Sequence, residues 1–138
     1  MVKTVETVSL SSGIIGETFV AHELKIGAER LESMGLQVKF SKNALKGIEY
    51  IKNHPEDRAS DLLAAYADPD VDMILCAIGG DDTYRLLPYL FENDELKKVV
   101  NDKIYSVWRK CISRCRRASD TISSFIVFNM SEFIFLHI

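Results

Sequence analysis

Two glycines and two aspartates interrupt the chain directly after an apolar run. The run MILCAI occupies residues 73–78, and Gly79-Gly80-Asp81-Asp82 follows it before a helical pattern of apolar residues begins. Glycine has no Cβ, so the pair can adopt positive φ and let a ligand approach the backbone, while the amides that open the next helix point outward. Amides placed in this way could bind a phosphate or the oxyanion that develops when a carbonyl group is attacked.

The two aspartates argue against the phosphate. They place negative charge where a phosphate-binding loop has glycine, lysine or serine, and the chain contains neither G-x-G-x-x-G nor G-x-x-x-x-G-K-[ST]. A plainer interpretation is that Gly79-Gly80 is only a tight turn and that Asp82 is the N-cap of the helix that follows. The local sequence leaves the oxyanion turn and the plain turn both open.

Other candidate groups are weaker. Ser11 and Ser12 precede Gly13 and are typical of an ordinary turn. Cys111 and Cys115 could share one helical face, but two thiols without further ligands make a poor zinc site, so we expect no metal. The remaining candidates are Cys76, a core residue inside the apolar run, and His22, His54 and His137, which we expect to be exposed or satisfied by neighbours.

The elements that must position these groups alternate between strand and helix. Strands are predicted over residues 5–10, 36–40, 73–78 and 103–107; helices over 17–34, near 46–51, from Pro55 to about Asp68, over 84–90 and over 94–100. This order predicts a three-layer α/β fold, with a flavodoxin- or Rossmann-like, mostly parallel sheet and helices on both faces. Ligands bind at the carboxyl ends of such strands, so the turns after Leu10 and Ile78 carry most weight.

The totals are those of one soluble domain. The chain has 138 residues and a net charge of −3, which argues against a general nucleic-acid binder. The first ten residues lack a secretion signal, which predicts a cytoplasmic protein with three free thiols. The apolar stretch 125–138 is too short to span a membrane, which takes about 20 apolar residues. Across residues 109–117, five of nine residues are basic, which is most simply a solvated face.

Several stretches together resemble a known family. They are VSLSSGIIGE, ERLESMGLQV, NDKI and the long segment that runs from NALKGIEYIKNHPEDRASD through MILCAIGGDDTYRLLPYL. In order and nearly without gaps over residues 5–104, they are similar to the N-terminal domain of the LD-carboxypeptidase family of serine peptidases. That family includes muramoyl-tetrapeptide carboxypeptidases and microcin self-immunity hydrolases, and GGDDTYRLLPYL resembles the immunity-like branch most closely.

The resemblance implies a site that this chain holds only in part. The family's Gly-Gly turn supplies oxyanion amides, which here would be those of Gly79, Gly80 and Asp81. Its nucleophile lies in G-[FY]-S-D, so Ser119 in Ser-Asp-Thr is the nucleophile candidate, with the Asp120 amide beside the oxyanion. The family's catalytic Glu and His come from a separate C-terminal domain, which we expect to be absent. The implied substrate is a cell-wall muropeptide or a peptidyl-nucleotide antibiotic, with no cofactor, nucleic acid or membrane involved.

The departures from the family begin after Ile104. Residues 105–118 are basic and divergent, and residues 119–138 are family-like only in part. Arg117-Ala118 replaces Gly-[FY], although a nucleophile turn needs a small residue two positions before the serine because strand and helix backbones crowd there. The Ser119 turn is therefore imperfect, and we expect no hydrolysis by this chain alone.

Two alternatives remain. The chain could be a truncated or frameshifted α/β module that serves only in binding or self-association, in which case an exposed apolar face favours a homodimer. The architecture also allows a flavodoxin-like nucleotide binder, but a fold alone implies no function, and we expect neither FMN nor ATP to bind.

Overall fold

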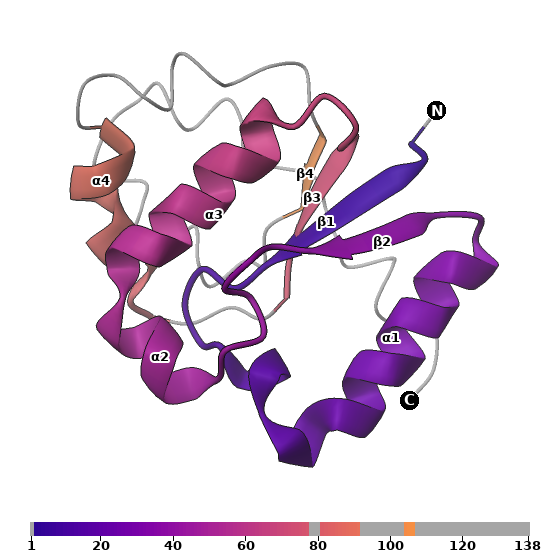
Figure 1. Ribbon diagram of the computed structural model, residues 1–138, viewed down its shortest axis with the longest axis horizontal. Coiled ribbons are helices and arrows are strands. Elements are labelled where there is room, and N and C mark those ends of the chain that lie inside the picture. The colour runs from indigo at the N-terminus through magenta and orange to yellow at the C-terminus, as the bar shows by residue number, and fades with distance from the viewer. Residues whose placement is uncertain (1, 78–80, 92–103, 107–138) are drawn as a thin grey trace.

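The computed structural model describes residues 2–77, 81–91 and 104–106 (Figure 1). Its centre is a sheet of four strands, β1 (Thr4–Val8), β2 (Gln37–Phe40), β3 (Met73–Cys76) and β4 (Ile104–Ser106). All three pairings are parallel, and the strand order is β2-β1-β3-β4. The predicted parallel α/β sheet is thus confirmed.

Strand β1 is one of the two inner strands of the sheet. It pairs with β2 on one side and β3 on the other, so that Val5 lies between Val38 and Met73. All five of its residues are buried. Central strands of parallel sheets are covered on both faces, which is why this short segment tolerates so little exposure.

Helix α1 (Ala21–Ser33) begins four residues later than the predicted start at Glu17. Glu17 has an extended backbone, and its Oε1 accepts a hydrogen bond of 2.7 Å from the Ile48 amide, so two short 3-10 turns, Ile14–Gly16 and Thr18–Val20, precede the helix. The predicted C-terminal glycine is confirmed. Gly35 has φ +81°, its amide donates to the Glu32 carbonyl, and the Leu36 amide donates to the Leu31 carbonyl, which is a Schellman motif.

The other helices lie on the opposite face of the sheet from α1 (Figure 1). They are α2 (Ile48–Asn53), α3 (Pro55–Ala67) and α4 (Leu87–Phe91), the last preceded by a 3-10 turn, Thr83–Leu86. Pro55 opens α3 as predicted, since its missing amide hydrogen is not needed there. The chain moves from β1 outward to β2 and then back past β1 to β3. Right-handed crossovers in opposite directions place their helices on opposite faces.

The larger core lies between the sheet and α3 with α4. Its buried members include Val8, Ala59, Tyr66, Ile74 and Leu86. By contrast, none of the 13 residues of α1 is fully buried, and its predicted apolar stripe is only half-buried. Among the described residues, more side chains are therefore buried around α3 than around α1.

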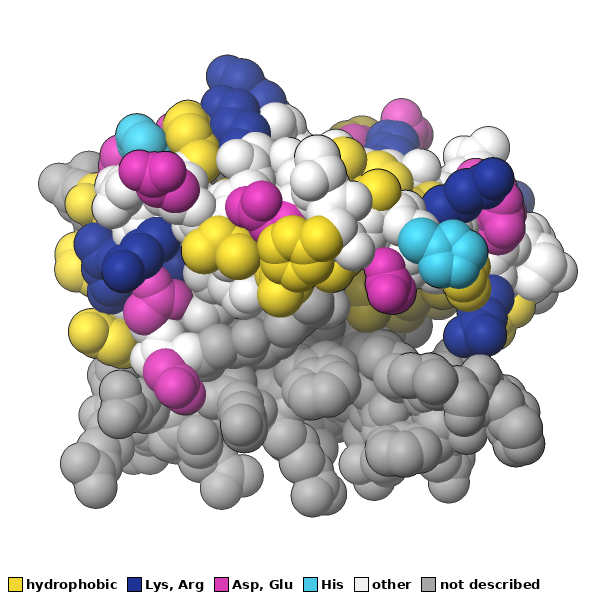
Figure 2. Space-filling view, turned by 90° about the horizontal axis from the view of Figure 1, so that it is seen from below, with side chains coloured by type: hydrophobic (Ala, Val, Ile, Leu, Met, Phe, Trp, Pro, Cys, Tyr) yellow, Lys and Arg dark blue, Asp and Glu magenta, His cyan; other side chains and the backbone are white. Residues whose placement is uncertain are grey.

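Some predictions fall outside the described residues. The helix expected over 94–100 and every residue from 107 onward belong to this group. Across the part of the chain that is described, no helix combines the length and the apolar character that a membrane crossing would require. Figure 2 shows one face of the molecule, on which hydrophobic, acidic and basic side chains are interleaved without one sign of charge dominating.

Candidate functional site

The candidate site lies where the strand order reverses. The carboxyl ends of β1 and β3 are adjacent, since Val8 pairs with Cys76 and the Ala77 amide donates to the Val8 carbonyl at 3.0 Å. The chain leaves β1 toward one face of the sheet and β3 toward the other, which opens a crevice at this point in α/β sheets. The strand ends that lead toward the two turns singled out from the sequence, Val8 and Cys76, therefore lie side by side.

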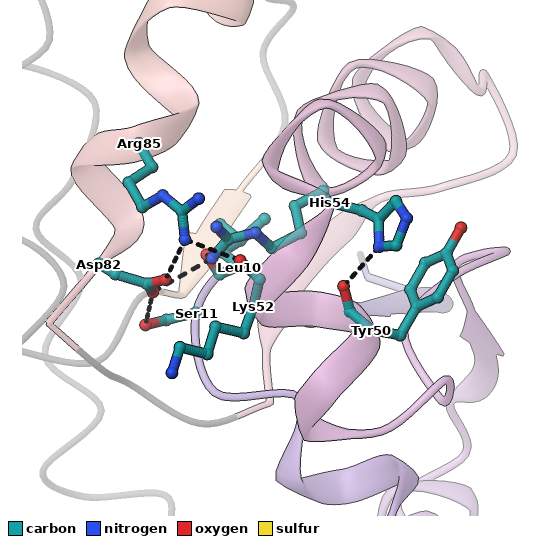
Figure 3. Close-up of polar contacts among 8 residues, drawn as sticks. Leu10, Ser11, Tyr50, Lys52, His54, Asp82 and Arg85 are labelled. Atoms are coloured by element: carbon teal, nitrogen blue, oxygen red, sulfur yellow. Dashed lines mark hydrogen bonds and ion pairs between the residues drawn. The ribbon is translucent and has the colours of Figure 1, made fainter.

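Asp82 joins these two turns (Figure 3). Its Oδ1 accepts a hydrogen bond of 2.6 Å from the Ser11 hydroxyl and one of 3.1 Å from Nη1 of Arg58. Its Oδ2 lies 3.6 Å from Nη1 of Arg85. The carboxylate side chain is 29% exposed, so it is screened from water on most sides but not sealed. One carboxylate thus binds a hydroxyl and two guanidinium groups from three separate segments.

Arg58 is the most deeply buried of these residues. It lies in α3 with no exposed surface, and its Nη1 also donates to the Leu10 carbonyl at 3.0 Å. Its Nε and Nη2 are buried and have no hydrogen-bond partner in the described part of the chain. A buried guanidinium with unpaired donors is unusual, because desolvated N–H groups almost always find an acceptor. The side chain is therefore held by Leu10 and Asp82 alone among its described neighbours.

Arg85 extends the network to a further element. Its Nη1 donates to the Lys52 carbonyl in α2 at 2.7 Å, as Figure 3 shows. Arg85 is 39% exposed, so water weakens its ion pair with Asp82 more than it weakens the pair with Arg58. The Asp82 cluster, defined here as Ser11, Arg58, Asp82 and Arg85, consequently ties the β1 and β3 turns to α2 and α3.

The N-cap interpretation of Asp82 is confirmed for its position only. Asp82 does occupy the residue before the 3-10 turn Thr83–Leu86, but its side chain makes no capping hydrogen bond. Its Oδ1 instead accepts from the Ser11 hydroxyl and from Arg58, whose charged guanidinium forms a stronger bond to a carboxylate than a neutral donor does. Likewise, Ser11 is more than a turn residue, because its hydroxyl crosses from one turn to the other.

The described residues include only part of the predicted site. Asp81 is exposed and lies next to the Asp82 cluster in sequence. Gly79, Gly80, Ser119 and Asp120 lie outside the described residues. The sequence analysis did not identify Arg58 as part of the site. One signal was available, because Arg58 is a charged residue directly beside Ala59, on the side of α3 that was predicted to be buried.

His54 has another set of contacts. Its ring stacks on Tyr50 with centroids 4.1 Å apart, and its Nδ1 lies 2.9 Å from the Tyr50 carbonyl oxygen (Figure 3). These contacts involve α2 and the start of α3 rather than the Asp82 cluster. His54 is thus satisfied by its neighbours, as expected, and His22 is exposed.

A second group of buried acids lies farther along the sheet. The Asp61 carboxylate in α3 accepts two hydrogen bonds from Asn43. The backbone amide of Asn43 donates one at 3.0 Å, and the side-chain amide of Asn43 donates the other at 2.8 Å. Burial raises the pKa of the Asp61 carboxyl, and the two Asn43 hydrogen bonds oppose that change. In β1, the Glu6 carboxylate accepts a hydrogen bond of 2.5 Å from the Ser41 hydroxyl. These pairs fix the loop after β2 onto the core, which is a structural role.

Within the described ranges, no three His, Cys, Asp or Glu side chains gather where they could hold a metal ion. Cys76 is buried in β3, in the core position that the sequence predicts. The chemistry that the described site can offer is therefore that of hydrogen-bond donors, a held carboxylate and the backbone beside it.

Known proteins are similar to this chain in sequence and in fold. A structure of an MccF-like protein from Streptococcus pneumoniae, solved in complex with AMP, is 62% identical with a TM-score of 0.75, over 76% of this chain and 31% of that one. The microcin C7 self-immunity protein MccF is 26% identical with a TM-score of 0.63, over 75% and 29% of the two chains. A "Probable murein peptide carboxypeptidase" of Bacillus subtilis (strain 168) is 38% identical over 56 residues, 41% of this chain and 18% of the relative.

The chain thus spans less than a third of the length of each of these proteins. The model of the LD-carboxypeptidase N-terminal domain matches residues 5–106. This range includes every residue of the Asp82 cluster and all four strands, apart from the first residue of β1. The resemblance drawn from the sequence is confirmed: the chain belongs to the LD-carboxypeptidase family and carries its N-terminal domain.

Proposed function

We propose that this chain is the N-terminal part of a serine carboxypeptidase that hydrolyses the amide before a C-terminal residue. The substrate is a cell-wall muropeptide or a peptidyl-nucleotide antibiotic, and the compartment is the cytoplasm. The observation that carries the proposal is the 62% identity to an MccF-like protein that binds AMP. The murein peptide carboxypeptidase named above supports the muropeptide as the other substrate class.

The proposed roles follow the family resemblance. Ser119 attacks the carbonyl carbon, and the amides of Gly79, Gly80, Asp81 and Asp120 stabilise the oxyanion. Serine needs a general base, because its hydroxyl is barely nucleophilic at neutral pH. The Glu and His of the family belong to a separate domain, so residues 1–138 alone are inactive. No metal or cofactor takes part, since an oxyanion hole and a triad suffice for acyl transfer.

A chimera tests this proposal. Residues 5–106 of this chain would replace the matching segment of the pneumococcal MccF-like protein, which supplies its own remaining two-thirds. We expect the chimera to hydrolyse an L,D-tetrapeptide or an aminoacyl-sulfamoyl adenosine, and the 138-residue chain to hydrolyse neither. The intact pneumococcal protein is the positive control. A chimera that folds but turns over no substrate that the control accepts contradicts the proposal, as does turnover by the 138-residue chain.

A second function is supported by exposed apolar side chains. Phe19 is 67% exposed, Leu45 is 41% exposed and Ile48 is 39% exposed. The Glu17 carboxylate binds the Ile48 amide, which brings the segment before α1 next to the start of α2. Apolar side chains gathered on a rigid surface favour association, so the alternative is a non-catalytic module that forms a homodimer.

A further inference from the structure

We propose that Arg58 is a positioning residue for the backbone at Asp81 and Asp82, acting through the Asp82 carboxylate. The inference rests on the proposed function, in which the amide of Asp81 belongs to the oxyanion turn. Nothing in the sequence pattern assigns Arg58 a role, and its side chain reaches no surface from which it could contact a substrate.

The first step is the geometry of a single nitrogen. Nη1 of Arg58 donates to the Leu10 carbonyl at 3.0 Å and to Oδ1 of Asp82 at 3.1 Å. Leu10 follows β1 and Asp82 follows β3, so one buried atom fixes the separation of the two turns. Helix α3 carries that atom on its buried side and packs on the larger core of the described fold.

The second step is the choice of residue type. A buried ion pair seldom stabilises a fold more than apolar side chains of the same volume would, because both charges lose their hydration. Arg58 also leaves Nε and Nη2 without an acceptor in the described part of the chain, which adds to that cost. A guanidinium here is therefore a poor device for stability alone. What it provides, and an apolar side chain cannot, is a fixed direction for the Asp82 carboxylate.

The third step is the role of Ser11. Its hydroxyl donates a hydrogen bond of 2.6 Å to Oδ1 of Asp82, the same atom that Arg58 binds. The carboxylate is therefore held from the β1 turn and from α3 at once. Two donors on one oxygen restrict the Asp82 side chain, and through it the backbone of Asp82 and its neighbour Asp81. Oxyanion donors must hold their places closely, since a displacement of about 1 Å can cost on the order of 100-fold in rate.

Amide hydrogen exchange of the full 138-residue chain, followed by NMR, tests this role. The R58M variant removes the donor and keeps much of the volume. Three hydrogen-bonded amides report on this part of the chain: Ala77, which donates to the Val8 carbonyl, Arg85, which donates to the Asp82 carbonyl, and Leu87, which donates to the Tyr84 carbonyl. We expect exchange at these three amides to rise about tenfold or more relative to the change at the β1 amides, since a local opening then replaces a held turn. The R58K variant keeps a positive charge near Asp82 and should recover part of the protection at these three amides.

R85Q is the matched control. It also removes a guanidinium next to Asp82, but one that is 39% exposed and 3.6 Å away, so exchange at the three amides should change less than about threefold. If R58M fails to fold, D82N reports on the same link, since it keeps the shape and weakens the acceptor. Equal increases at every amide, or no local increase in R58M or D82N, would overturn the proposal. Because no substrate is used, these outcomes are independent of whether the chimera hydrolyses anything.

Discussion

At the scale of single residues, the Asp82 cluster combines a fully buried cation with a partly hydrated anion. Arg58 has no exposed surface, whereas the Asp82 side chain is 29% exposed. The two partners are therefore unequal: water can replace some of what Asp82 loses, but it cannot reach Arg58. Removing one partner of a buried pair is costly chiefly because the other charge stays buried without compensation.

This inequality predicts that D82A is more destabilising than R58M. D82A leaves the Arg58 charge buried with only the Leu10 carbonyl, and should lower the free energy of unfolding by about 2–4 kcal/mol. R58M leaves a carboxylate that water and Ser11 still solvate, and also removes two unpaired donors, so we expect a loss below about 1.5 kcal/mol. Urea unfolding of both variants checks the order.

D81A is the control for that experiment. Asp81 is exposed and adjacent, so its loss should change the free energy of unfolding by less than about 0.5 kcal/mol. The argument fails if R58M unfolds more easily than D82A at the same urea concentration.

At the scale of elements, the turn after β1 fits closely against the segment before α2. A Cβ built on Gly16 would lie 2.5 Å from the backbone atoms of Leu45 and Gly47, a distance that real Cβ atoms do not show. A Cβ on Gly27, in the middle of α1, would meet nothing within 4 Å. The same residue type is thus required at one position and merely tolerated at the other.

Alanine at these two positions should have opposite effects. G27A should raise the free energy of unfolding by about 0.5–1 kcal/mol, because alanine loses less conformational entropy in a helix. G16A should lower it by about 2 kcal/mol or more, since backbone on both sides must move. Thermal unfolding by circular dichroism measures both. A stable G16A variant would contradict the observed packing of the two segments.

The start of β1 is held by another carboxylate, which predicts a pH dependence. Oδ2 of Asp72 accepts a hydrogen bond of 2.8 Å from the Lys3 amide and one of 3.0 Å from the Thr4 amide. These hydrogen bonds lower the pKa of Asp72 below its ordinary value of 3.8. A lowered folded-state pKa stabilises the fold above pH 3.8, and this stability is lost as the pH falls through the folded-state pKa.

D72N should therefore unfold at a lower urea concentration than the wild type at pH 7, and the difference should vanish at pH values where Asp72 is protonated in the folded protein. D70N, which changes a neighbouring exposed carboxylate, should show no such pH-dependent difference. A gap between D72N and wild type that is the same at pH 7 and at pH 3 would show that the charge is not what matters.

At the scale of the whole molecule, the described fold presents apolar side chains to solvent. Phe19, Met34 and Tyr84 are each about half exposed or more, and Leu45 and Ile48 lie close to that range. The described part of α1 also covers its side of the sheet without burying any of its own residues fully. Surfaces of this kind favour contact with another protein surface.

We accordingly expect the 138-residue chain to sediment as a species larger than its 15.6 kDa monomer at tens of micromolar. F19S should shift the distribution toward the monomer, because Phe19 is the most exposed of the large apolar side chains described. K25S, a change at an exposed polar position of α1, is the control. A wild-type chain that stays monomeric throughout this range would count against self-association.

Local sequence patterns were sufficient for the order of the elements and for several of their ends. The β-branched and apolar runs predicted the strands, and Pro55 and Gly35 predicted helix ends, because each signal depends on the backbone preferences of a few neighbouring residues. The start of α1 was predicted too early because Glu17 is engaged by a distant segment, which no local pattern reports.

The contacts of the Asp82 cluster depended on the folded chain. Ser11 and Asp82 are 71 positions apart, and Leu10 and Arg58 are 48 apart, so only the pairing of β1 with β3 and the packing of α3 bring them together. The sequence could mark Asp82 as a charged residue after two glycines, with a cap as its simplest role. It could not show that a buried arginine and a serine bind the same oxygen, because those contacts depend on distances between segments far apart along the chain.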